Sequence, residues 1–354
     1  MTFATSPSLD SNLSPLADPE VLHYSQSNER FVIENREESF VCVFAGATGG
    51  IGASTLEKMA TMLHAPTFHV IGRSAERFAI QQAKLETLNP TCKVVFLEAE
   101  VSLISDVDAA CKQITAAEKK VDYLFMSPGM LPFNGAQCMW IFSLTISLLT
   151  ARIDTKEGVE TSFALSYYSR LRLTENLLPL LRQSPRPRVL SVLNGGKEKV
   201  MLEDDLGLEQ HWSSGNLMGH TATMTSLAFQ YLAEGESNKR IAFLHAASGL
   251  VNTDIYSRLT APESSGIVWR MALPLLKGLL SVLWFCLAIS PEESGERQAF
   301  NLTSDDFGPG ALRIDQSNQL ISTKGVLEEY IERGWQEKVW EHTVRAFEKA
   351  LTMD

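Results

Sequence analysis

The chain has 354 residues, of which 45% are hydrophobic, enough for a sizeable buried core in one large domain or two smaller ones. Its formal net charge of −11 argues against a nucleic-acid-binding surface, because neutralising phosphates requires clustered Lys and Arg. A small-molecule substrate is therefore the expected partner.

The cysteines form an odd, scattered set without the spacing of metal ligands. We expect them to be reduced packing residues of a cytoplasmic protein and expect no metal site. They are Cys42, Cys92, Cys111, Cys138 and Cys286.

Residues 1–36 are predicted to form a loose N-terminal tail. The first twenty or so are rich in Ser, Pro and Asp, and no basic segment is followed by an apolar one. A signal peptide is therefore not expected. One folded domain is predicted over residues 37–302, followed by a C-terminal helical extension over residues 303–354.

A glycine-rich turn organises the start of the domain. An apolar run from Val41 to Ala45 predicts a strand, and a helix is predicted to continue to about Leu63. Glycines let the backbone between them turn sharply, and the free N–H groups at a helix N-terminus favour an anionic pyrophosphate. The turn therefore predicts a dinucleotide site, with Gly46, Thr48, Gly49, Gly50, Ile51 and Gly52 as candidate cofactor-binding residues.

The next strand, Thr67–Ile71, ends just before Gly72 and Arg73. In dinucleotide-binding folds this strand end lies beside the adenine ribose, where an arginine accommodates a 2′-phosphate. Arg73 therefore favours NADP(H) over NAD(H). The alternative is that Arg73 only begins the next helix in solvent.

Strands and helices then alternate along the chain. This alternation predicts an α/β fold with a doubly wound, mostly parallel sheet. The expected helices are Ala75–Leu88, Ser105–Glu118, Glu157–Leu181 and Gly219–Glu234, and the expected strands are Lys93–Glu100, Val121–Met126, Arg188–Leu193 and Ile241–Ala246.

Two features of the later chain stand apart from this alternation. Trp269–Ser290 is the most apolar run, but Lys277 near its middle is costly in a bilayer. We expect a lid over the cleft, within residues 257–290, or a helix on a membrane surface that gives peripheral contact through residues 269–290. Apolar residues at helical spacing between Val326 and Leu351 predict core packing.

Five motifs lie between about Phe40 and Phe300: Gly46-x-x-x-Gly50-Ile51-Gly52, Gly72-Arg73-Ser74, Asn176–Leu181, Arg188–Val192 and Gly249–Thr253. With these motifs the chain resembles the short-chain dehydrogenase/reductase family over that range. The resemblance implies a Rossmann fold and adds Ser127, Gly129 and Thr253 as cofactor-binding residues. The stretches Ser191–Glu198 and Gly334–Thr343 look like those of a divergent fungal group in secondary metabolism.

Beside these family members, residues 138–153 have no counterpart. They are an apolar insertion, interpreted either as a flap or as a retained intron translated in the gene model.

The resemblance also implies a catalytic pattern that this sequence does not keep. The family uses a Tyr acid, a Lys that lowers its pKa, a Ser that binds the substrate oxygen and an Asn that holds a water. The corresponding positions hold His220, Met224, Asn194 and Ser166. His220 could exchange a proton and Asn194 could hydrogen-bond a carbonyl oxygen, or His220 could pack at a helix start and Asn194 close a turn. Met224 is expected to be apolar lining.

Tyr168 and Arg172 also have the spacing of the family's Tyr and Lys. They lie on the helix before the fifth strand, so we interpret this spacing as coincidental.

Three functions follow. The first is an atypical NADP(H)-dependent oxidoreductase that acts on an apolar small metabolite. In it His220 is the proton donor, Asn194 binds the oxyanion, and Ser166 stands at the position of the family's Asn. The second is a non-redox isomerase, dehydratase or cyclase on the same fold. The third is a catalytically silent cofactor-binding protein. The family resemblance also allows a homo-oligomer.

Overall fold

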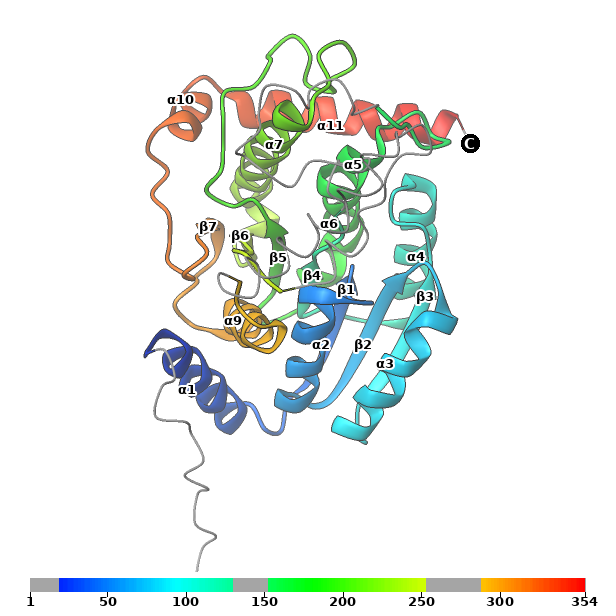
Figure 1. Ribbon diagram of the computed structural model, residues 1–354, viewed down its shortest axis with the longest axis vertical. Helices are drawn as coiled ribbons and strands as arrows, with labels where there is room; N and C mark the ends of the chain where they lie inside the picture. The colour runs from blue at the N-terminus through cyan, green and yellow to red at the C-terminus, as the bar shows by residue number, and fades with distance from the viewer. Residues whose placement is uncertain (1–18, 130–151, 253–287, 354) are drawn as a thin grey trace, which may run out of the picture.

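The computed structural model describes residues 19–129, 152–252 and 288–353 (Figure 1). Its centre is a seven-stranded sheet in the order β3-β2-β1-β4-β5-β6-β7, and every neighbouring pair is parallel. This confirms the predicted doubly wound α/β fold. The strands are β1 (Ser39–Ala45), β2 (His64–Gly72), β3 (Lys93–Glu98), β4 (Tyr123–Met126), β5 (Arg188–Leu193), β6 (Ala242–Ala247) and β7 (Gly310–Ile314).

Helices cover both faces of the sheet (Figure 1). One face carries α1 (Pro19–Glu34), α2 (Gly50–Met62), α3 (Ala75–Leu88) and α9 (Pro291–Thr303). The other carries α4 (Ile104–Ala117), α6 (Ser169–Leu181) and α7 (Ser214–Glu234), with α10 (Val326–Glu332) and α11 (Trp335–Thr352) packed outside them.

The strands are buried on both faces, as parallel sheets require. Side chains of β1 alternate between two clusters: Val43 packs in the cluster shared with α4, α6 and α7, whereas Phe44 packs in the one shared with α2 and α9. Both side chains are fully buried. Cys42 and Cys111 are also buried free thiols, consistent with the packing role expected for the cysteines.

The prediction of a loose tail over residues 1–36 is wrong for its second half. Pro19–Glu34 forms α1, which lies beside α9 in Figure 1. Tyr24, Asn28 and Phe31 share one face of α1 and are buried, and the Asn28 amide donates to the Glu296 backbone carbonyl at 3.1 Å. The helix is stable because this face is covered, which only the tertiary contact with α9 reveals.

The prediction of a purely helical extension over residues 303–354 also needs correction. Gly310–Ile314 forms β7, the edge strand that pairs with β6. After it, α10 and α11 follow as expected, and the predicted apolar stripe is core packing: Tyr330, Trp335, Val339 and Phe347 are all buried.

The helix expected from Glu157 begins later and is irregular. α5 (Thr161–Phe163) runs into a π-helical turn, η1 (Ala164–Tyr168), and then into α6. Glu157 instead caps α4: its carboxylate accepts hydrogen bonds from the backbone N–H groups of Ile104 at 2.5 Å and Ser105 at 3.0 Å. A carboxylate at a helix N-terminus is favoured by the helix dipole.

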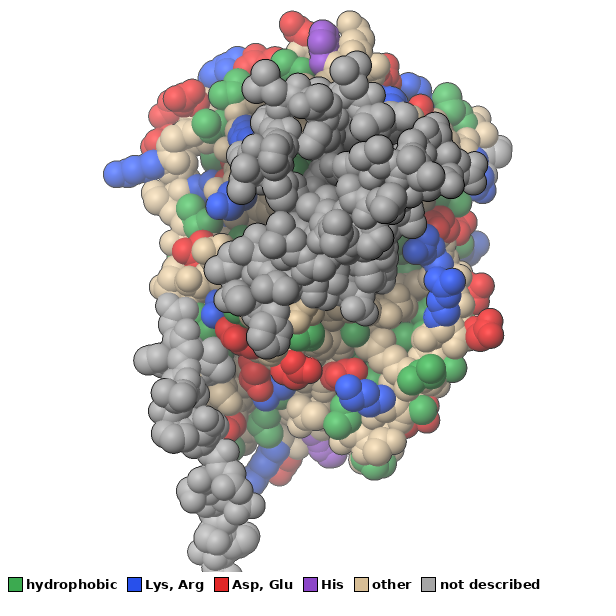
Figure 2. Space-filling view, in the orientation of Figure 1, with side chains coloured by type: hydrophobic (Ala, Val, Ile, Leu, Met, Phe, Trp, Pro, Cys, Tyr) green, Lys and Arg blue, Asp and Glu red, His purple; other side chains and the backbone are tan. Residues whose placement is uncertain are grey.

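Several sequence-based expectations lie outside the described residues. These are most of the insertion at 138–153, most of the lid at 257–290 and Thr253. Among the helices that the structure does describe, none combines the length and apolar character needed to cross a bilayer. On the face in Figure 2, Lys and Arg side chains of the described residues are scattered among Asp and Glu side chains.

The docking of α1 can be tested with two neighbouring residues. Phe31→Ala should lower the free energy of unfolding by about 3 kcal/mol, since it empties a buried aromatic site. Ile33→Ala, at a side chain that is 71% exposed, should change it by less than about 0.5 kcal/mol. Urea denaturation measures both, and equal effects would show that α1 is not docked.

The docking of α11 should depend on pH. The Tyr168 hydroxyl lies 2.8 Å from Nε2 of His342, and burial lowers the pKa of His342 to about 4. Because an unfolded His titrates near pH 6.5, the unfolded chain binds more protons between these values, and the unfolding free energy should fall as pH decreases from about 6.5 to 4.

His342→Gln should flatten this slope between about pH 6.5 and 5, measured by urea denaturation at each pH. His64→Gln, at an exposed side chain, serves as the control and should leave the slope unchanged. Identical slopes for His342→Gln and the native chain would contradict the role given to His342.

Candidate functional site

The glycine turn after β1 is pressed against the loop after β4. Gly46 has a φ of +80°, and a Cβ there would lie 2.4 Å from the backbone nitrogen of Pro128. A Cβ at Gly52 would lie 2.5 Å from the Gly46 carbonyl oxygen. Only glycine fits these two positions, because both distances are shorter than any real Cβ contact.

The same turn leaves room for a ligand at the start of α2. Nothing in the described structure lies within 4 Å of a Cβ built on Gly49, the residue before α2. Among the described residues no side chain caps this helix N-terminus, so its first N–H groups can receive an anion. These features fit the pyrophosphate of a dinucleotide, as predicted from Gly46, Gly49, Gly50 and Gly52.

The other predicted cofactor residues surround this cradle. A Cβ on Gly72 would meet the Thr48 methyl group at 2.8 Å, so Thr48 lies over the end of β2. Ile51 packs against the cluster under α2. The Ser127 hydroxyl donates to the Gly46 carbonyl oxygen at 3.2 Å. Gly129, two residues on, is exposed.

Arg73 lies directly after β2, as expected. Its side chain is 68% exposed, and its nearest anionic partner is the Glu100 carboxylate at 3.6 Å. Ser74, the next residue, caps α3 through its hydroxyl. Arg73 therefore stands at the strand end with a guanidinium that an added phosphate could reach.

Asn194 and Ser166 both carry polar groups available to a ligand. Asn194 follows β5 and is half-buried, and its carbonyl accepts the N–H of Lys197 at 3.0 Å. Ser166 lies in the π-helical turn and is 8% exposed. Neither side chain hydrogen-bonds any other described residue. The predicted turn-closing role of Asn194 is thus carried by its backbone, and its amide has no hydrogen-bond partner among the described residues.

His220 is held differently. It is 2% exposed on α7; its Nε2 accepts the N–H of Leu202 at 2.9 Å, and its Nδ1 lies 3.4 Å from the Leu206 carbonyl oxygen. The proton therefore resides on Nδ1. Burial lowers the pKa of His220, which keeps the ring neutral. These contacts anchor residues 202–206. His220 is therefore packed, as the alternative interpretation expected, but it lies six residues inside α7 rather than at the start of the helix, and the acid role stays a prediction.

Two neighbouring positions are accounted for by packing. Met224 is fully buried in the core cluster beneath α7, consistent with the expected apolar role. Tyr168 is 4% exposed and faces α11 through His342, and burial raises its pKa above the usual range of a tyrosine. Tyr168 is therefore part of the α11 contact.

The residue that sequence reasoning missed is Arg170, which is fully buried at the start of α6. Its guanidinium donates to carbonyl oxygens at the ends of β4 and β5 and to Leu165 in the π-helical turn. The sequence did carry one signal. Arg170 lies three residues after Tyr167 and four before Thr174, which places it on the inward face of the helix, where an apolar residue would be usual.

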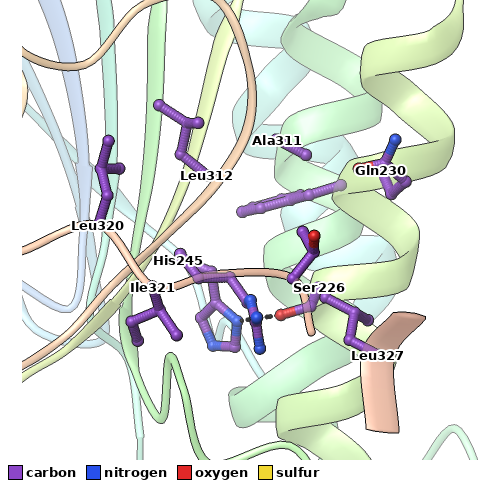
Figure 3. Close-up of a pocket in the computed structure, with 11 residues that line it drawn as sticks. Ser226, Gln230, His245, Ala311, Leu312, Leu320, Ile321 and Leu327 are labelled. Carbon is purple, nitrogen blue, oxygen red and sulfur yellow. Dashed lines mark hydrogen bonds between the residues drawn. The ribbon is translucent and has the colours of Figure 1, made fainter. Parts of the chain in front are cut away.

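A second missed group lies behind Asn194. Glu198 accepts the Ser226 hydroxyl at 2.7 Å and the Arg313 guanidinium at 2.8 Å, and Ser226 lies 2.9 Å from Nδ1 of His245. Figure 3 shows Ser226 and His245 joined at a cavity of about 130 Å³. Because Ser226 sits between His245 and Glu198, the order differs from a nucleophile triad, in which the histidine is central. The group holds the turn after Asn194.

No group of three His, Cys, Asp or Glu among the described residues is arranged to hold a metal ion.

Comparisons with known proteins agree with this arrangement. The KR domain profile matches residues 41–139. The chain is 34% identical to the oxidoreductase lepF of Aspergillus flavus over 349 residues, which covers 88% of this chain and 92% of that protein. It is 33% identical to an oxidoreductase of Emericella nidulans over 343 residues, covering 88% of this chain and 94% of that one.

Among solved structures, the fold is similar to that of the NADPH-bound carbonyl reductase from chicken fatty liver. The TM-score is 0.53 at 14% identity, over 80% of this chain and 94% of that one. With a matching domain profile, this fold and oxidoreductase relatives that span most of its length, the chain belongs to the short-chain dehydrogenase/reductase family.

Proposed function

We propose that the protein is an NADP(H)-dependent oxidoreductase that reduces a carbonyl group of an apolar small metabolite, or oxidises the corresponding alcohol, in fungal secondary metabolism. The observation that carries the proposal is the uncapped, open start of α2 at Gly49, with Arg73 at the neighbouring strand end. The oxidoreductase relatives are fungal, which supports the setting.

In this proposal the first N–H groups of α2 bind the pyrophosphate, and Arg73 binds the 2′-phosphate of the adenine ribose. Arginine suits this task because its planar guanidinium can donate two hydrogen bonds to one phosphate. NADPH, when bound, would supply the hydride that the carbonyl carbon receives.

Asn194 is proposed to bind the substrate oxygen. Its amide N–H₂ can donate to an oxygen that becomes negative as the carbonyl is reduced, and it has no other partner among the described residues. Ser166 offers a hydroxyl on the neighbouring helix. His220 would act as the proton donor only by giving up its contact with the Leu206 carbonyl, which at 3.4 Å is long for a hydrogen bond.

The non-redox alternative has a specific observation in its favour. Met224 stands where the family has a Lys, and both His220 nitrogens already face backbone groups. An isomerase, dehydratase or cyclase would need the cleft and its polar groups but no hydride transfer. Both the redox and the non-redox proposal take a small apolar substrate. Family resemblance also leads us to propose a homo-oligomer.

The purified protein can be tested directly. Binding of NADPH is followed by its fluorescence, and turnover by loss of its absorbance with a panel of apolar ketones, with products identified by mass spectrometry. Ketone reduction with equal loss of NADPH is the expected result. A product at the oxidation level of the substrate, formed without NADPH loss, would instead establish the non-redox alternative.

Arg73→Ala should weaken NADPH binding by tenfold or more, on the order expected for a lost charged pair, while NADH binding changes little. The physical reason is that NADH lacks the 2′-phosphate. Lys84→Ala, which removes an exposed cation farther along α3, is the control and should affect neither. Equal weakening of NADPH and NADH by Arg73→Ala would remove the argument for NADP(H).

Asn194→Ala should lower kcat by about a hundredfold, the usual loss when one oxyanion donor is removed, with the Kd of NADPH unchanged. Asn216→Ala, which removes an amide that donates to the His211 carbonyl at 2.9 Å and is not one of the candidate site residues, is the matched control. A variant Asn194→Ala with native kcat would assign the substrate oxygen to another group.

The anchoring role of His220 can be distinguished from a proton-donor role by measuring both stability and turnover. His220→Ala should lower the unfolding free energy by about 1–3 kcal/mol, because the Leu202 N–H loses its buried partner. If His220 is also the proton donor, kcat should disappear in this variant even where it is folded, whereas Tyr168→Phe should keep it. Native kcat in folded His220→Ala would leave only the anchor role.

A further inference from the structure

Arg170 is a buried cation whose described partners are all neutral. It is 0% exposed. Each nitrogen of its guanidinium donates a hydrogen bond, and no carboxylate of the described residues lies within ion-pair distance. The acceptors are the carbonyl oxygens of Leu165, Met126, Val192 and Pro128 and the hydroxyl of Ser191.

These acceptors place the charge at the ligand-binding edge of the sheet. Met126 ends β4, Pro128 lies in the loop after it, and Val192 lies two residues before Asn194. In doubly wound folds, ligands bind in the crevice at the carboxyl ends of the strands. Because Arg73 marks the adenine half beyond β2, Arg170 lies under the other half of the crevice.

The charge persists at neutral pH and reaches its surroundings. Burial lowers the pKa of Arg170 to about 9, so the guanidinium is protonated at pH 7. The neighbouring His245 has its pKa lowered to about 4, first by burial and also by the positive charge of Arg170. A buried charge with no counter-ion among the described residues is costly, so a role for the charge at this edge deserves a test.

Resting on the proposed NADP(H) function, we propose that Arg170 makes the nicotinamide half of the crevice electropositive and thereby favours NADPH over NADP⁺. The nicotinamide ring is neutral in the reduced cofactor and carries one positive charge in the oxidised one. A fixed cation nearby therefore penalises only the oxidised form. This preference favours the complex that is ready to reduce a carbonyl.

The size of the effect follows from Coulomb's law. Two unit charges roughly 10–20 Å apart, at an effective dielectric constant of about 20, change the ratio of dissociation constants by about fourfold to sixteenfold. A purely structural role for Arg170 predicts something else: its loss would weaken both cofactor forms by the same factor.

The test measures the Kd of NADPH and of NADP⁺ by calorimetry, without substrate. The native protein should bind NADPH at least about fourfold more tightly than NADP⁺. Arg170→Gln, which keeps a hydrogen-bonding side chain but removes the charge, should shift the ratio of the two constants towards NADP⁺ by a similar factor. Arg172→Gln is the matched control, since that arginine is already paired with Asp108 at 2.6 Å.

A second variant guards against failure of Arg170→Gln to fold. Ser191→Asp keeps Arg170 and sets a carboxylate where the Ser191 hydroxyl lies, 2.7 Å from Nη1. It should shift the ratio in the same direction as Arg170→Gln. Circular dichroism confirms that each variant is folded.

The outcomes separate the two proposals. If neither cofactor form binds the native protein, the proposed NADP(H) function is wrong and the inference falls with it. If both bind and the ratio stays native in a folded Arg170→Gln or Ser191→Asp variant, the role of Arg170 is refuted while the cofactor function stands. Native binding that is equal for the two forms also overturns the inference.

Discussion

The close approach of two loops, the turn after β1 and the loop after β4, is the constraint on which the rest of the site depends. Because β1 pairs with β4, their carboxyl ends emerge side by side, and Gly46 meets the backbone of Pro128 with no space for a Cβ. The contact fixes the turn that leads into α2, whose first N–H groups donate to no capping side chain of the described residues.

Arg170 extends the same constraint to the neighbouring strands. Its guanidinium ties the loop after β4 to the end of β5 and to the π-helical turn that holds Ser166. π-helical turns are rare, and this one is stabilised where the Leu165 carbonyl accepts the Arg170 Nε–H at 3.2 Å. One buried side chain thus joins three of the segments that border the crevice, and the five hydrogen-bonded groups around it offset part of its desolvation.

The glycine turn and the predicted catalytic positions are built differently. The turn depends on backbone contacts at Gly46 and Gly52, whereas His220 and Met224 are both buried side chains. Behind Asn194, the Glu198 carboxylate accepts hydrogen bonds from Ser226, from Arg313 and from the Gly196 N–H, and these contacts secure the turn after β5. Among the described residues at this edge, the side chains of Asn194 and Ser166 make no hydrogen bond.

The sequence by itself determined strands β1 to β6 and the glycine turn after β1, because these follow from local patterns: apolar runs of strand length, helices between them and glycines at close backbone contacts. It also located Arg73, since a strand end is a position along the chain. Only the tertiary structure showed the role of residues that depend on distant partners. Helix α1 packs against α9, strand β7 pairs with β6, and Glu157 caps a helix 53 residues away in the sequence. His220 and Arg170 show the same limit, since whether a polar side chain meets a substrate or a backbone carbonyl depends on contacts that no local spacing records.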